Sequence, residues 1–270
     1  LETTIAGAEG DTILLANYYG NRLFYSDTAV ANAQGLAVFA RKSGYKPGLY
    51  AVLPGKGRVN IVLNEPLIQL ATEAADPAGR LRVIASRENT IYHVERKVAE
   101  ALPEPQRSAA LNELITANSG TLAAMVIRME QEPAKAEVRA ANGSLDSAAT
   151  ADRFRHHYWD NTDLHDERIV YGPVFQNRLE ALLAIGLPQQ ADVITNYLDS
   201  LITRCGQAAE VRRFIVSLAI KKYQDLETQG LGAVCVRMAQ RYVCTGAAGT
   251  AGPEWKPQDQ WRKTCVLAAR

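Results

Sequence analysis

Seven side chains of the kinds that bind metal ions lie within twelve consecutive positions of this chain. Imidazole nitrogens and carboxylate oxygens are the ligand types that zinc and manganese accept. The set comprises His156, His157, Asp160, Asp163, His165, Asp166 and Glu167. If an ion were bound here, we would expect its ligands among His156, His157, Asp160 and His165.

The spacing within this segment argues against a metal site. It contains no HExxH pattern, and no two histidines stand four residues apart as on one face of a helix. A calcium loop would need a central glycine and a terminal bidentate glutamate, which are absent. The segment is therefore interpreted as a polar connector. Its acids would cap helices, and Tyr158 and Trp159 would enter the core. We expect no metal and no cofactor.

Four cysteines lie in the last quarter of the sequence, at positions 205, 235, 244 and 265. No CxxC pair and no zinc-like spacing occurs among them. The simplest interpretation is buried or free thiols. If one disulfide forms, we expect Cys235 with Cys265, because an antiparallel last helix would return Cys265 alongside the helix that carries Cys235.

Other catalytic patterns are missing. There is no GxSxG motif for a serine nucleophile. The glycine-rich run 246–252 lacks the Gly-Lys-Ser/Thr ending of a phosphate-binding loop. No catalytic residue is assigned, and the chain is not expected to be an enzyme by itself.

The elements that would position these residues begin with a β region at 1–85. Short runs of alternating apolar and polar residues are separated by turns rich in glycine, proline and asparagine. We expect an antiparallel β-sandwich or open barrel, because no segment between the runs fits the crossover helix of a parallel pair. The expected strands are 12–16, 22–30, 36–40, 49–53, 59–63, 68–72 and 81–85.

At Ser86 the apolar period changes from that of a strand to that of a helix. Ser86 is a good N-cap, and the apolar residues after it predict one buried helix face. These residues are Ile91, Val94, Val98 and Leu102. Connecting helices continue to residue 133. The Ala-rich, charged stretch 134–152 is interpreted as an interdomain linker, and 153–270 as an all-α helical bundle, so the fold class is α+β.

Composition excludes several classes of protein. The formal net charge is +1, which gives no basic field for nucleic acid. No stretch approaches the roughly 20 apolar residues that a membrane-spanning helix needs.

Two stretches are similar to known modules. TIAGAEGDTILLANYYGNRLFYSDTAVANAQGLAVF with PGLYAVLP resembles the β domain of unknown function 4369, found at the front of exported thioredoxin-like proteins of the Bacteroidetes. HHYWDNTDLHDERIVYGPVFQNRLEALL with LGAVCVRMAQRYV resembles the helical domain of unknown function 5106 of the same proteins. The order of the two modules matches.

The resemblance implies a function. In that family a redoxin domain with a CxxC pair follows these modules, and the protein is secreted or anchored as a lipoprotein in the periplasm. This chain is then expected to be the non-catalytic N-terminal scaffold or binding region of a thiol-disulfide oxidoreductase. Its partner would be a C-terminal thioredoxin-like domain, absent from this chain, or an envelope protein client. No catalytic residue can be transferred.

A second hypothesis is a stand-alone cell-envelope protein that binds glycan or peptide. Four tyrosines of the β region would provide a stacking platform if they were exposed on one face. They are Tyr18, Tyr19, Tyr25 and Tyr50. The competing interpretation is that they pack in the core. The oligomeric state is left open.

Overall fold

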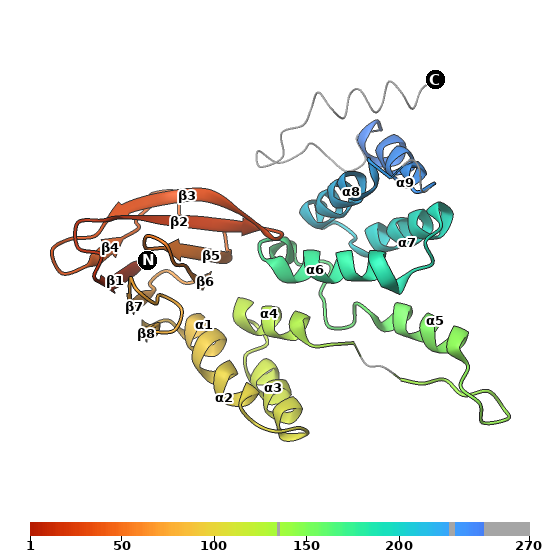
Figure 1. The fold of residues 1–270 in the computed structure, drawn as a ribbon, viewed down its shortest axis with the longest axis horizontal. Coiled ribbons are helices and arrows are strands. Elements are labelled where there is room, and N and C mark those ends of the chain that lie inside the picture. Colours follow the sequence, from red (N-terminus) through yellow and green to blue (C-terminus); the bar gives the residue numbers. More distant parts are fainter. Residues whose placement is uncertain (134–135, 227–229, 246–270) are drawn as a thin grey trace. The chain divides into compact units, whose positions relative to one another are not determined.

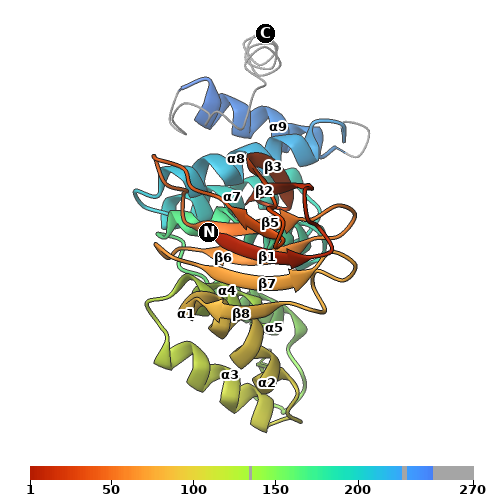
Figure 2. The ribbon, with the colours of Figure 1, turned by 90° about the vertical axis from the view of Figure 1, so that its left-hand side faces the viewer.

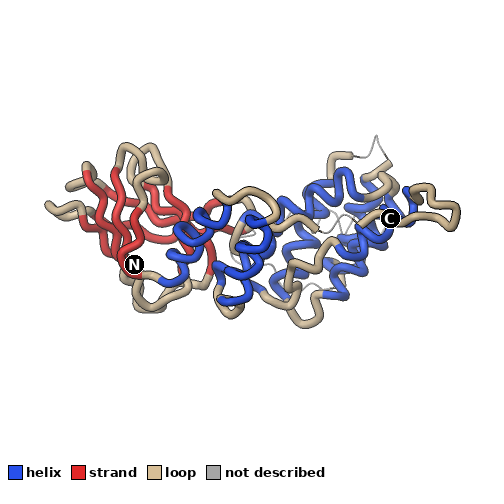
Figure 3. Tube along the Cα trace, turned by 90° about the horizontal axis from the view of Figure 1, so that it is seen from below, coloured by secondary structure: helices blue, strands red, loops and turns tan. Residues whose placement is uncertain are grey.

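The computed structural model describes residues 1–133, 136–226 and 230–245. The chain is of the mixed α+β class and divides into two compact units. Unit 1 comprises residues 1–132 and 171–176, and unit 2 comprises 133–170 and 177–270. All strands of the two sheets lie in unit 1, whereas the described part of unit 2 is helical apart from one isolated bridge (Figure 3).

Unit 1 contains two four-stranded sheets, with orders β4-β1-β7-β8 and β3-β2-β5-β6 (Figures 1 and 2). Each strand expected from the sequence is present, and β1 is an additional one that the sequence analysis missed. The bounds are β1 (Glu2–Ala6), β2 (Thr12–Tyr19), β3 (Arg22–Val30), β4 (Leu36–Val38), β5 (Gly48–Leu53), β6 (Val59–Leu63), β7 (Gln69–Glu73) and β8 (Arg82–Ala85).

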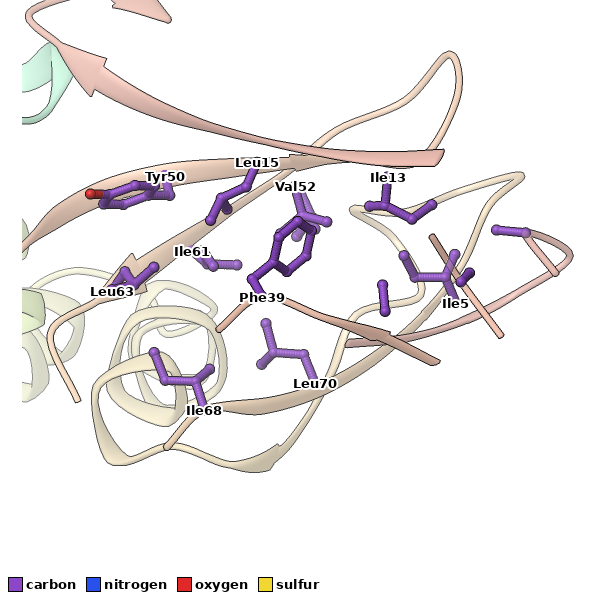
Figure 4. Packing of buried hydrophobic residues seen from close by; sticks show 14 residues of the cluster. Ile5, Ile13, Leu15, Phe39, Tyr50, Val52, Ile61, Leu63, Ile68 and Leu70 are labelled. Atoms are coloured by element: carbon purple, nitrogen blue, oxygen red, sulfur yellow. The ribbon is translucent and has the colours of Figure 1, made fainter. Parts of the chain in front are cut away.

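The two sheets share one hydrophobic core. Leu15 and Val52 come from one sheet, Ile5 and Leu70 come from the other, and Phe39 lies between them (Figure 4). All five side chains are almost completely buried. Burial of an apolar side chain of this size stabilises a fold by about 1.5–3 kcal/mol, so this cluster is the main source of stability in the β region.

The expectation that all strands of this region pair antiparallel is wrong for one pair. β1 pairs with β7 in parallel, from Glu2 opposite Gln69 to Ala6 opposite Glu73. A parallel pair needs a long return connection, and an α-helix is its usual form. Here the strands of the second sheet lie between β1 and β7 in the sequence, so the chain returns through them and needs no helix.

Five helical elements follow β8 in unit 1, and the first three of them form one continuous helix (Figure 1). Ser86 caps the first of them, as predicted, because its hydroxyl accepts the N–H of Asn89 at 3.0 Å. The bounds are α1 (Arg87–Asn89), continued by the π-helix η1 (Thr90–Glu95) and by α2 (Arg96–Glu100), then α3 (Gln106–Ala117) and α4 (Leu122–Glu130).

The predicted apolar face of this first helix is wrong. Ile91 is fully buried, but Val94, Val98 and Leu102 are exposed, Val98 by 67%. The cause is η1. A π-helix closes its hydrogen bonds over five residues and has more residues per turn, so the side chains after Ile91 are rotated away from the face that an α-helical period predicts.

All secondary-structure elements described in unit 2 are helices. Among the described residues, no helix is long and apolar enough to cross a membrane. The bounds are α5 (Ser147–His157), the 3₁₀-helix η2 (Glu167–Val170), α6 (Pro173–Ala181, whose first residues are counted with unit 1), the π-helix η3 (Leu182–Gly186), α7 (Ala191–Arg204), α8 (Ala209–Tyr223), α9 (Gly232–Met238) and the π-helix η5 (Ala239–Val243).

The stretch 134–152 differs from the expected linker. Residues 134 and 135 lie outside the described residues, Arg139 pairs with Leu145 in an isolated bridge, and α5 begins at Ser147. Asp146 caps α5 by accepting the N–H of Ala149 at 2.9 Å. The division between the units falls at 132/133, so the connecting helices 86–132 belong with the strands.

Candidate functional site

A polar pocket of about 450 Å³ lies within unit 1. Strand β6 and the turn before it form one wall, and the η1–α2 helix forms the other. The lining comprises Arg58, Val59, Asn60, Ala78, Tyr92, His93, Arg96, Lys97 and Glu100. This volume is within the range of small-molecule sites, roughly 300–1,000 Å³.

The helix is held against β6 by two side chains that take the place of a further strand. β6 is the last strand of its sheet. The Asn89 amide accepts the N–H of Val62 at 2.9 Å and donates to the Val62 carbonyl at 2.8 Å. Nε2 of His93 lies 2.9 Å from the carbonyl oxygen of Asn60. Because a carbonyl only accepts, Nε2 carries the hydrogen.

The two bonds follow one another along both elements. Asn89 ends α1, and His93 lies in the π-helix η1 that continues it. Asn89 and His93 are four apart, and Val62 and Asn60 are two apart, so one helix can satisfy both positions of the edge. The same contacts set the distance between the two walls of the pocket.

Arg96 is fixed on the helical wall by several partners. Its Nε donates to Glu100 at 2.7 Å, and its Nη1 lies 2.8 Å from Glu130. The guanidinium carbon lies 5.4 Å from the centre of the Tyr92 ring. Burial raises the pKa of Glu130, although the neighbouring Arg96 opposes this shift. Burial also raises the pKa of Tyr92 to about 12, so the phenol stays neutral at physiological pH.

We expect unit 1 to lose stability in acid through His93. Burial, the largest cause, and the charge of Arg96 lower the pKa of His93 below its ordinary value of 6.5, while the bond to Asn60 opposes the shift. As the pH falls below 6.5, the unfolded chain therefore takes up a proton before the folded one does, and stability is lost down through the folded-state pKa.

The measurement is an NMR pH titration of the histidine ring protons, with assignment by His93→Gln. The His93 resonance should titrate below pH 6.5, and the variant should lose less unit 1 stability between about pH 7 and pH 5. Titration at or above 6.5 would contradict the expectation.

The histidine- and acid-rich segment forms two separate pairs and no common site. Nδ1 of His157 lies 2.7 Å from Asp160, and Nδ1 of His165 lies 3.3 Å from Asp163. The ring of His156 stacks edge-on against that of His157. Within residues 1–133, 136–226 and 230–245, no three His, Cys, Asp or Glu side chains are grouped so that they could hold a metal ion.

The rest of this segment has the structural role expected of a connector. Asp163 accepts the backbone N–H of His165, and Asp166 accepts that of Arg168, both at 2.9 Å. Tyr158 and Trp159 are buried as predicted.

The expected disulfide between Cys235 and Cys265 is not formed. Cys205 and Cys235 are buried and form no disulfide, whereas Cys244 is disulfide-bonded. Cys265, the other half of the predicted pair, lies outside the described residues. Cys235 is one of the buried residues of α9.

The tyrosines do not form a stacking platform. Tyr18, Tyr19 and Tyr50 are buried, and only Tyr25 of the four is exposed, by 69%. The hypothesis of a glycan- or peptide-binding face required these four tyrosines to be exposed together, and they are not.

Sequence reasoning missed the pocket. Its residues come from a β-hairpin, a turn and a helix that are separated along the chain, and no motif joins them. One local signal existed: Tyr92, His93, Arg96 and Lys97 lie within six positions of the helix that follows the predicted N-cap.

No family model, no curated protein and no solved structure matches this chain.

Proposed function

We propose that this chain is the non-catalytic N-terminal scaffold or binding region of an exported thiol-disulfide oxidoreductase of the thioredoxin-like kind. Unit 1 would be a β-sandwich with attached helices, and unit 2 a helical bundle. Together they would position or present a redoxin domain carried on other residues, or bind an envelope protein client. The resemblance to exported modules points to the periplasm or cell envelope.

The observation that carries this proposal is the environment of the thiols. Cys205 is fully buried, and its Sγ donates to the carbonyl of Leu201 at 3.2 Å. Burial raises the pKa of this thiol to about 12, against the smaller opposing effect of Arg212 and Arg204. Thiol-disulfide exchange proceeds through an accessible thiolate. At pH 7 a thiol of this pKa is ionised in only about one molecule in 10⁵. Cys205 and the buried Cys235 thus support a structural role.

We expect the purified chain to give no turnover in an insulin-reduction assay with dithiothreitol or thioredoxin reductase as the electron source. A CxxC-containing thioredoxin serves as the positive control. Robust turnover by this chain would overturn the non-catalytic assignment.

Thiol labelling tests the same assignment without a substrate. In the native protein, Cys205 and Cys235 should react with a disulfide reagent at least about a hundredfold more slowly than in urea, because both are enclosed by packed side chains. Cys205→Ala and Cys235→Ala variants assign the two reactions. Fast labelling of either residue in the folded state would contradict the burial argument.

A further inference from the structure

We propose that the pocket between β6 and the η1–α2 helix binds the oxyanion group, carboxylate or phosphate, of a small ligand. This goes beyond the scaffold role proposed above and depends only on the geometry of unit 1. The pocket is enclosed by residues of one compact unit, so it does not depend on how the two units are arranged.

The pocket lining carries more positive charges than negative ones. Three cations, Arg58, Arg96 and Lys97, face a single lining carboxylate, Glu100. Arg96 is already compensated, because Glu100 and Glu130 both hold it. Among the residues that the structure describes, neither Arg58 nor Lys97 has an ion-pair partner. Two uncompensated cations therefore remain, one from each wall.

Among the neutral lining residues, Asn60 is arranged as a donor. The Tyr18 hydroxyl donates to Oδ1 of Asn60 at 2.9 Å, so the amide oxygen is occupied. No described residue accepts a hydrogen from Nδ2 of Asn60, which is left to donate. The Asn60 carbonyl is likewise occupied by His93. Asn60 thus adds a neutral donor to the positive charges of Arg58 and Lys97.

An oxyanion matches this set. An arginine guanidinium offers paired donors to a carboxylate or phosphate, and a lysine ammonium offers a compact charge. Arg96 does not need to move, because its carboxylate and ring contacts already hold it. We assign Arg58 and Lys97 the binding role, with Asn60 as the neutral donor, and Arg96 the role of fixing the helical wall.

The test is an NMR titration of the ¹⁵N-labelled full chain at pH 7 and constant ionic strength, with inorganic phosphate in one arm and acetate in the other. We expect saturable shifts in the amides of 58–60 and 92–97. The arm that responds identifies the source of the oxyanion, and a saturable response in either arm supports the proposal. Arg58→Gln/Lys97→Gln should raise the Kd at least about tenfold, since charge-assisted bonds from both walls are removed.

The matched control is Arg22→Gln/Lys42→Gln, which removes the same two charges from exposed positions of unit 1 outside the pocket. Its Kd should stay within about twofold of the wild type. Circular dichroism should be unchanged in both double variants, because all four side chains are exposed. The proposal is overturned if neither anion gives a saturable shift up to about 50 mM, or if the two double variants weaken binding equally.

Discussion

Glu88→Ala should destabilise unit 1 by about 3 kcal/mol or more, because it removes a buried carboxylate on which three donors depend. Glu88 is almost completely buried in α1. It accepts the N–H of Leu122 at 3.0 Å and of Ala123 at 2.6 Å, the first two residues of α4. Its third donor is the Asn64 amide, at 2.6 Å.

The physical reason is that a helix start leaves its first N–H groups without partners. The Thr121 hydroxyl accepts the N–H of Ala124, and Glu88 accepts those of Leu122 and Ala123. The carboxylate also places a negative charge at the positive end of the helix dipole, which is favourable. Truncation would leave buried N–H groups unpaired.

The measurement is hydrogen exchange followed by mass spectrometry in increasing urea, with α4 and β6 peptides as reporters and unit 2 peptides as the internal reference. Glu113→Ala on the exposed side of α3 is the control and should change stability by less than about 0.5 kcal/mol. Equal behaviour of the two variants would show that Glu88 does not support α4.

Trp159→Ala should destabilise unit 2 by about 3–5 kcal/mol, the usual cost of removing a buried indole. Trp159 is 1% exposed. Its Nε1–H donates to the Tyr197 hydroxyl at 3.0 Å, which connects the connector segment to α7. The Arg178 guanidinium lies 5.6 Å from its ring, and the Tyr158 ring packs edge-on at 5.0 Å.

Two smaller changes separate packing from hydrogen bonding. Tyr197→Phe keeps the volume but removes the hydroxyl that accepts the indole N–H, so we expect a loss of about 1–2 kcal/mol. Trp159→Phe retains most of the apolar contact and should fall between this value and that of Trp159→Ala. Urea-dependent hydrogen exchange of α6 and α7 peptides reports the effect. A loss below about 1 kcal/mol in Trp159→Ala would mean that the connector is not part of the core.

The sequence by itself determined the local elements. Alternating runs and turn residues placed the strands from β2 to β8, and Ser86 marked the change to helix. The aromatic pair Tyr158 and Trp159 was correctly expected in the core. These features depend on neighbours within a few residues, which the order of residue types records directly.

Tertiary structure decided which elements meet. The parallel pairing of β1 with β7 joins strands more than sixty residues apart, and an apolar pattern shows that a strand has a buried face without showing its neighbour. The π-helix turned Val94 and Val98 outward against their period.

The pocket, too, is decided by tertiary structure. Asn89 and His93 are ordinary polar residues of a helix until they lie along the edge of β6, where they bond to the backbone of Val62 and Asn60. Only that contact brings Arg58 and Lys97 to opposite walls of one cavity. A side chain's hydrogen-bond partner far along the chain leaves no mark in a single sequence, so the site depends on packing that local pattern cannot specify.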